Sequence, residues 1–75
     1  MMAFDYSKLK GRIVEKYQTQ QAFAKVIGLS ERSLSLKLNN KKAWKQPEIC
    51  RAINLLGLSN DDINEYFFKE KVKSL

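Results

Sequence analysis

Residues 19–40 read TQQAFAKVIGLSERSLSLKLNN, and this stretch predicts two short helices joined by a tight turn. Thr19 can cap a helix over residues 20–27, because a threonine hydroxyl accepts a hydrogen bond from a free amide of the first helical turn. Gly28 is expected to end that helix, since glycine adopts the left-handed conformation found at many helix C-termini without penalty.

Leu29 and Ser30 are all that separates this glycine from a second helix, predicted over residues 31–38 with Ser30 as its cap. Two residues determine how these two helices are expected to pack against each other. Ala24 is small, which lets the two helices cross closely, and Leu34 is an apolar plug that holds the second helix against the rest of the domain. Two short helices joined by such a turn are typical of a helix-turn-helix.

Three further helices are predicted from apolar residues at helical spacing and from capping residues. They cover residues 6–17 with Asp5 as N-cap, residues 47–56 opening on Pro47, and residues 61–69 capped by Ser59. No segment alternates like a strand, and no linker or repeat divides the 75 residues. We therefore expect residues 1–75 to form one compact all-α domain of five helices, with the helix-turn-helix at its centre. The tail from residue 69 onward is expected to fray.

Positive charge is concentrated in the first part of the chain. Residues 1–45 carry ten Lys or Arg against three Asp or Glu, a net charge of +7. Residues 46–75 carry four against five, a net charge of −1. This asymmetry indicates an anionic partner on one side of the molecule rather than lysines spread for solubility.

Residue types that support catalysis are scarce. The chain has no histidine, one cysteine, no glycine-rich phosphate loop and no cluster of metal ligands. We therefore expect no enzyme activity, no cofactor, no metal site and no small-molecule ligand. Cys50 is predicted to be a small core residue, and Trp44 to pack its loop onto the core rather than stack on a base.

The stretch from Thr19 to Asn40 resembles the helix-turn-helix of the phage Cro and repressor family, the XRE-like group. The similarity extends more loosely through GLSNDDINEYF and so covers most of residues 6–68. It implies a DNA-binding domain of the lambda-repressor type, short like Cro. It also implies a sequence-specific transcriptional regulator, a repressor that binds a palindromic double-stranded DNA operator as a homodimer, with the second helix of the motif in the major groove.

Carried over by position, the resemblance implies two sets of DNA contacts. The set expected to read bases lies on the 31–38 helix and consists of Glu31, Arg32, Ser35 and Leu36. The set expected at the sugar-phosphate backbone consists of Gln20, Ser30, Asn39, Asn40, Lys41, Lys42 and Lys45. Arg32 suits base reading because arginine bonds guanine through two hydrogen bonds, and no carboxylate at helical spacing competes for it.

Three residues of the 31–38 helix leave alternatives open. Leu36 can pack on a thymine methyl or can simply be a lone exposed leucine. Glu31 can accept from a cytosine amine, although its favourable position at a helix N-terminus is the preferred explanation. Lys37 stands where the family usually has an apolar residue, so its stem is expected over the edge of the core with the amine in water.

A second functional class remains open beside DNA binding. The chain can instead be a small protein-binding module that docks on a host or phage protein and keeps the helix-turn-helix as a scaffold. The basic half favours DNA, and a steep salt dependence would separate the two classes. Candidates for a dimer interface are Leu55, Leu58 and the Tyr66–Phe68 cluster, although core packing is the preferred explanation for most of them.

The expected location is the cytoplasm of a bacterial host cell, with the protein on the nucleoid when bound to DNA. The apolar clusters are far too short to span a bilayer, and the N-terminus MMAFDYSKLK shows no secretory signal. A single cysteine also suits a reducing compartment.

Overall fold

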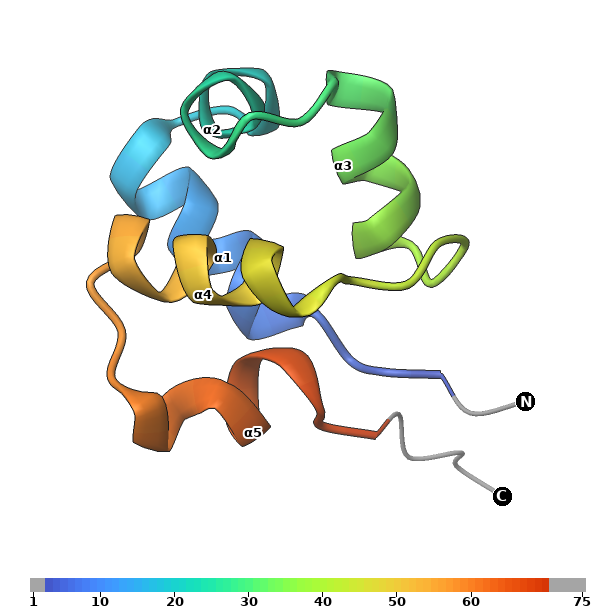
Figure 1. The fold of residues 1–75 in the computed structure, drawn as a ribbon, viewed down its shortest axis with the longest axis vertical. Coiled ribbons are helices and arrows are strands. Elements are labelled where there is room, and N and C mark those ends of the chain that lie inside the picture. Colours follow the sequence, from blue (N-terminus) through green and yellow to red (C-terminus); the bar gives the residue numbers. More distant parts are fainter. Residues whose placement is uncertain (1–2, 71–75) are drawn as a thin grey trace.

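The computed structural model describes residues 3–70 and gives five α-helices and one short 3-10 helix in that range (Figure 1). The elements are α1 (Ser7–Tyr17), α2 (Gln20–Ile27), α3 (Glu31–Leu38), α4 (Gln46–Leu55), η1 (Asn60–Asp62) and α5 (Ile63–Phe67). The predicted all-α, five-helix architecture is confirmed.

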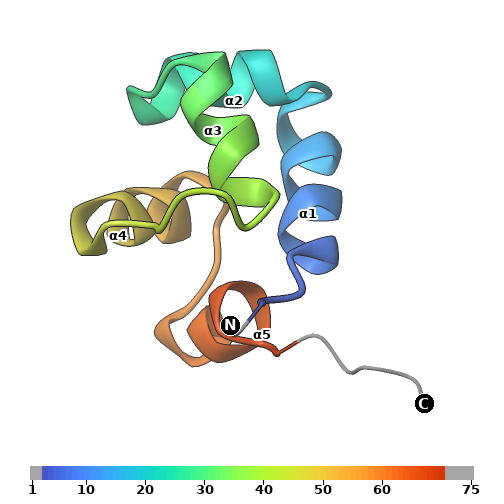
Figure 2. The same cartoon turned by 90° about the vertical axis from the view of Figure 1, so that its right-hand side faces the viewer.

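Helices α2 and α3 form one end of the molecule, and α5 lies at the opposite end (Figure 2). Helix α2 packs against α1, α3 and α4, whereas α5 packs against α1 and η1. The predicted helix-turn-helix therefore sits on top of a base formed by α1, α4 and α5. The second helix of the motif, α3, is left with one side facing outward.

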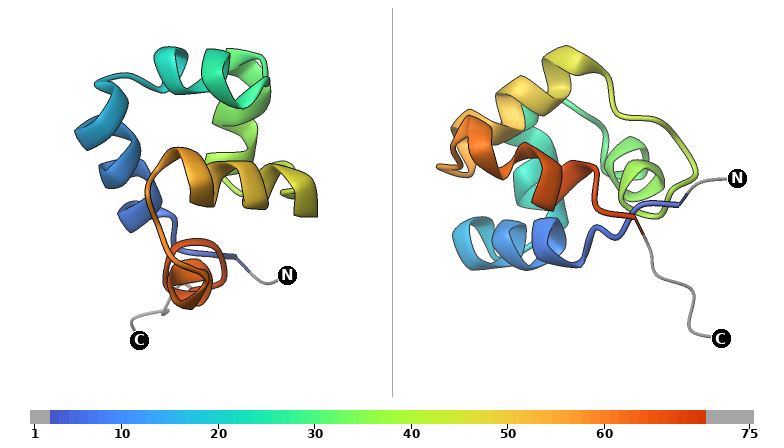
Figure 3. Two further views of the ribbon diagram at one scale, coloured as in Figure 1. Left: turned by 60° about the vertical axis from the view of Figure 1, so that its left-hand side comes forward. Right: turned by 90° about the horizontal axis from the view of Figure 1, so that it is seen from below.

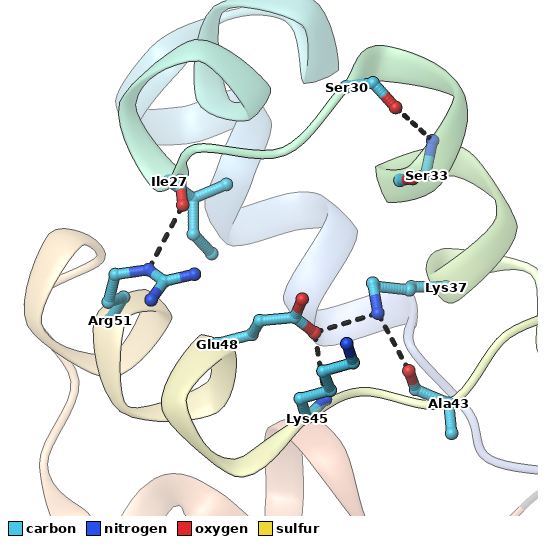
Figure 4. A network of polar contacts seen from close by, with 8 residues as sticks. All are labelled: Ile27, Ser30, Ser33, Lys37, Ala43, Lys45, Glu48 and Arg51. Carbon is cyan, nitrogen blue, oxygen red and sulfur yellow. Dashed lines mark hydrogen bonds and ion pairs between the residues drawn. The ribbon is translucent and has the colours of Figure 1, made fainter.

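Local hydrogen bonds explain why α2 and α3 begin and end where they do. The Thr19 hydroxyl accepts from the Ala22 amide at 3.1 Å. The Ser30 hydroxyl accepts from the amide of Ser33 at 3.0 Å (Figure 4). Between the two helices Gly28 has a φ of +81°, the left-handed conformation that a glycine tolerates best. The predicted caps and the predicted turn are confirmed.

A single apolar core joins the helices. Its buried members are Tyr6, Leu9, Ile13, Phe23, Ala24, Ile27, Leu34, Leu38, Ala52, Ile53, Leu56 and Phe67. Ala24 and Leu34 are in this core, as the spacing of the helix-turn-helix predicts. Arg51 adds a polar tie, because its Nε donates to the carbonyl of Ile27 at 3.2 Å and so fastens α4 to the end of α2 (Figure 4).

Three helices have boundaries that differ from the predictions. Helix α1 begins at Ser7 rather than residue 6, and its N-cap is Tyr6 rather than the predicted Asp5. The Asp5 carboxylate nevertheless accepts from the Ser7 amide at 2.9 Å. Helix α4 begins and ends one residue earlier than predicted. Helix α5 is much shorter than the predicted 61–69. Asp62 accepts from the Ser59 amide at 3.0 Å, and this bond accompanies a tight 3-10 turn before α5.

The chain segments before α1 and after α5 lie side by side (Figure 3). Phe4 and Glu70 form an isolated antiparallel bridge, and the Asp5 amide donates to the Lys69 carbonyl at 2.6 Å. The prediction that the tail frays from residue 69 is therefore wrong for residues 69 and 70, which are paired. Its remaining part, 71–75, lies outside the described residues.

Candidate interaction surfaces

The outward face of α3 brings together the four residues predicted to read bases. Glu31, Arg32, Ser35 and Leu36 line one shallow hollow on the surface. Glu31 and Arg32 are exposed, while Ser35 and Leu36 are half-buried. No ion pair engages Glu31 or Arg32 within residues 3–70, so both charges are available to a partner.

The residues predicted at the DNA backbone fall into two groups. Lys41, Lys42 and Lys45 have exposed side chains that form no ion pair in the described part of the chain. The others are already used within the fold or lie partly covered. Gln20 is half-buried at the start of α2, and Ser30 caps α3. The side-chain nitrogen of Asn39 donates to the Ser35 carbonyl at 2.8 Å.

Asn40 has an internal role that the sequence did not reveal. Its side-chain oxygen accepts from the Phe4 amide at 2.9 Å, and its side-chain nitrogen donates to the Phe4 carbonyl at 2.8 Å. Asn40 itself adopts a φ of +61°, which asparagine tolerates better than most residues. The side chain thus fastens the segment before α1 to the loop after α3, and it is poorly placed for the predicted phosphate contact.

Lys37 and Glu48 form a buried ion pair, and this corrects the prediction that the Lys37 amine lies in water (Figure 4). The side chains are 1% and 9% exposed, with 2.8 Å between Lys37 Nζ and Glu48 Oε1. Lys37 also donates to the Ala43 carbonyl at 2.8 Å, and Glu48 accepts from the Lys45 amide at 2.9 Å. The pair therefore ties α3, the following loop and the start of α4 together.

The ion pair also sets the protonation of Glu48. Burial alone would raise the pKa of its carboxyl, because burial disfavours the charged form. The hydrogen bonds from the Lys37 amine and the Lys45 amide, with the positive charges of the two lysines, outweigh burial and hold the pKa below its usual value. Glu48 is thus a carboxylate throughout the physiological pH range.

Acid is expected to destabilise the protein through Glu48. A pKa lowered by folding contributes stability above the ordinary glutamate value of about 4.3, and this contribution is lost as pH falls through the lower folded value. We expect urea unfolding midpoints to fall below about pH 4.3 in the unmodified chain and to fall less in Glu48→Gln. Glu31→Gln, which removes an exposed carboxylate without an ion pair in residues 3–70, is the matched control. Equal acid sensitivity of the two variants would contradict the assignment to Glu48.

A larger hollow, here called the aromatic groove, lies beside the loop after α3. It has a volume of about 780 Å³ and is bounded by the segment before α1, the loop, the start of α4 and α5. Its lining consists of Phe4, Tyr6, Asn40, Lys41, Lys42, Ala43, Trp44, Gln46, Ile49, Cys50, Ile63, Phe67 and Phe68. Most of these side chains are apolar, and none is acidic.

Two aromatic pairs shape this groove. The Trp44 and Phe67 rings meet edge to face with 5.2 Å between centroids, and the Phe4 and Phe68 rings do so at 5.8 Å. The prediction that Trp44 packs on the core is confirmed by its contact with buried Phe67. The Trp44 indole nitrogen is buried and finds no acceptor within the described residues, so one wall of the groove contains an unused hydrogen-bond donor.

The prediction of a buried Cys50 is wrong, because the side chain is exposed at the groove. Helix α4 turns Ala52, Ile53 and Leu56 into the core, and Cys50 falls outside that stripe.

Of the residues considered for a dimer interface, Leu55, Leu58 and Tyr66 pack against the core. Phe68 differs from them, because it is 47% exposed. The homodimer stays a prediction.

Other kinds of site find little support in residues 3–70. No group of three or more His, Cys, Asp or Glu side chains in this range is placed to hold a metal ion. None of the described helices is long and apolar enough to cross a membrane. The outward face of α3 and the aromatic groove are therefore the two candidate sites.

Comparisons with known proteins place the chain beside a phage regulator. No curated protein matches it. The solution structure of the modulator of repression (MOR) of the temperate bacteriophage TP901-1 from Lactococcus lactis is 53% identical and superposes with a TM-score of 0.78. The match covers 93% of this chain and 95% of that one. A family model described as "Protein of unknown function (DUF739)" matches residues 2–70, so the chain belongs to that family.

Proposed function

We propose that this chain regulates repression in a temperate phage by docking on the repressor protein of the same switch, inside the bacterial host. The similar structure is a modulator of repression, and the likeness extends over nearly the whole of both chains. A protein that modulates repression must change how a repressor acts, and direct contact with the repressor is the simplest way to do so. The observation that carries the proposal is the aromatic groove.

The groove has the composition of a protein-binding site. A large apolar hollow with a few polar groups at its edge is the usual form of a binding site, and exposed apolar patches mark interaction surfaces. Aromatic side chains are enriched at the energetic centres of protein interfaces. Here five aromatic side chains line one hollow, namely Phe4, Tyr6, Trp44, Phe67 and Phe68.

The charges of the first half of the chain support DNA binding less than their number suggests. Lys37 is buried against Glu48, Lys8 pairs with Glu65 at 3.0 Å, and Arg12 pairs with Glu15. Cations neutralised within the fold release fewer counterions from DNA and contribute less to affinity. The outward face of α3 also carries Glu31 beside Arg32, a mixture that suits a protein surface at least as well as phosphates.

The test follows a fluorescently labelled operator duplex by anisotropy, first with the purified repressor of the same phage and then with this chain added. We expect the chain to change the fraction of operator bound by the repressor and to bind the repressor without DNA. Phe68→Ala should weaken both effects, whereas Val26→Ala, which removes an exposed apolar side chain from α2, should not. A chain that binds the operator alone and leaves the repressor unaffected would contradict the proposal.

The second candidate function is the Cro-like one, a dimeric repressor of the XRE-like group that reads a palindromic operator with α3 in the major groove. The availability of Arg32 and of the three loop lysines favours it. The two functions differ in salt dependence, because DNA binding weakens with a slope of about −0.9 per phosphate contacted.

Arg32→Ala gives the sharpest result for this second candidate. If Arg32 pairs with a guanine, its removal is expected to cost about 1–3 kcal/mol of discrimination at one base pair. Selection of bound duplexes from a random DNA pool measures this, with Lys16→Ala on α1 as control. A loss that is uniform over all sequences would instead mark Arg32 as a phosphate contact, and absence of enriched sequences for the unmodified chain would remove the candidate.

A further inference from the structure

We infer that the aromatic groove takes an acidic amphipathic segment of the partner, with a large apolar side chain in the groove and carboxylates over Lys41 and Lys42. The inference rests on the proposed docking function and specifies the chemistry of the partner at the same site. It is carried by the lining of the groove, by the sign of the charges at its edge and by the absence of any acidic side chain in that lining.

The apolar part of the occupant follows from the rings in the groove. Phe67 is almost fully buried and its ring meets the Trp44 ring edge to face, so these two rings are fixed by packing. Phe68 is 47% exposed and touches Phe4, which leaves one aromatic face open to solvent. An incoming leucine, phenylalanine or tryptophan would cover that face and gain apolar contact with rings already in place. Anchors of this kind supply most of the free energy of protein association.

The charged part follows from the lysines at the edge. Lys41 and Lys42 line the groove, are exposed and have no ion-pair partner within residues 3–70. The carboxylate of Glu48 does not offset them, because it is bonded to Lys37. A partner that places carboxylates here gains electrostatic complementarity, whereas a basic segment is repelled.

Charge also argues against two other occupants. The residues that follow the described part of the chain, 71–75, read KVKSL and would bring two more lysines to Lys41 and Lys42. A second copy that docks through the same face would place the same pair of lysines opposite itself. A partner segment with acidic side chains avoids both repulsions.

The experiment measures binding of the full chain to the repressor in the absence of DNA, together with two labelled peptides. The first peptide is an acidic helix of about 15 residues with leucine or phenylalanine along one face, long enough for about four helical turns. The second has lysine in place of each acidic residue. We expect the acidic peptide to bind, to compete with the repressor and to shift the NMR signals of Trp44 and Phe68. The basic peptide should do none of these.

A matched pair of double variants tests the charges. Lys41→Glu with Lys42→Glu should weaken binding of the repressor by about tenfold or more, a change of about 1.4 kcal/mol or more. Lys16→Glu with Lys25→Glu alters two exposed lysines of α1 and α2 and gives the same net charge, so it should leave binding within about threefold. Urea unfolding confirms that both variants fold.

The outcomes separate the inference from the function on which it rests. One outcome is that the repressor binds, that Phe68→Ala weakens this binding, and that the two double lysine variants bind the repressor equally well. The inference of an acidic segment would then be wrong, while the proposal of docking in the groove would stand. Equal binding of the two peptides would overturn the acidic segment in the same way. If the unmodified chain does not bind the repressor at all, the proposed function and this inference both fail.

Discussion

Replacing Lys37 with methionine is expected to lower the free energy of unfolding by about 3–5 kcal/mol, because it leaves the Glu48 carboxylate buried without its charged partner. Glu48→Gln should have an effect of the same order, since the buried Lys37 amine then loses its charged partner and is left with neutral acceptors such as the Ala43 carbonyl. A domain of this size has little stability to lose, so either variant is expected to be partly unfolded at 37 °C. Urea unfolding monitored by circular dichroism measures the change.

Two variants separate the ion pair from simple loss of packing. Lys37→Met combined with Glu48→Leu should recover most of the lost stability, because apolar side chains of similar volume replace a buried pair at little cost. Lys42→Met alters an exposed lysine of the same loop and should change the free energy of unfolding by less than about 0.5 kcal/mol. A cost below about 1 kcal/mol for Lys37→Met would show that water reaches Glu48 and stabilises it alone.

Phe67→Ala is expected to cost about 3–5 kcal/mol of stability and to remove partner binding as well. Phe67 is 1% exposed and is the one fully buried side chain of α5, so it holds this short helix to the core. Its ring also packs against the Trp44 ring, with 5.2 Å between the ring centroids. Loss of the Phe67 ring would therefore leave the groove without a fixed wall. Thermal unfolding and repressor binding are the two measurements.

The neighbouring Phe68 provides the control. Phe68→Ala removes a ring that is about half exposed, so we expect it to cost about 1 kcal/mol or less in stability while it weakens binding. The two variants should therefore differ in their main effect, which is on stability for Phe67→Ala and on partner binding for Phe68→Ala. A Phe68→Ala variant with unchanged repressor binding would show that the groove is not the docking surface.

The helix-turn-helix was predictable because its signals are local. The caps by Thr19 and Ser30 depend on amides three residues away, and Gly28 indicates a left-handed turn because it follows directly on the helical run before it. Helix α5 was predicted less well. Its boundaries depend on a 3-10 turn at Asp62 and on the pairing of Lys69 with a segment at the other end of the chain.

The features that the sequence did not reveal depend on distant pairs. Lys37 and Glu48 are eleven positions apart on different helices, and either residue alone has the appearance of a surface charge. Asn40 and Phe4 are 36 positions apart. The aromatic groove combines residues from four segments, so it exists only once the fold has formed. The mistaken prediction for Cys50 has a related cause, because helical spacing alone did not show which side of α4 packs against α2 and the core.

The loop after α3 takes part in both functional proposals. Lys41 and Lys42 belong to the predicted DNA-backbone set and also line the aromatic groove. A partner that neutralises these two lysines would reduce the affinity of the chain for DNA, even if it touched no residue of α3. Partner binding and DNA binding are therefore expected to compete through charge.

The pairing of Asn40 with Phe4 has a consequence for hydrogen exchange. The Phe4 amide donates to the Asn40 side chain, and the Asp5 amide donates to the Lys69 carbonyl. Both bonds therefore depend on one corner of the molecule, where the segment before α1 meets the loop after α3 and the segment after α5. Such a corner opens at a lower free energy than the whole domain, because few buried contacts hold it. These two amides are therefore expected to exchange with deuterium together and well before the amide of Leu34. In Asn40→Ala both would exchange faster, which would report directly how often the groove loses its wall.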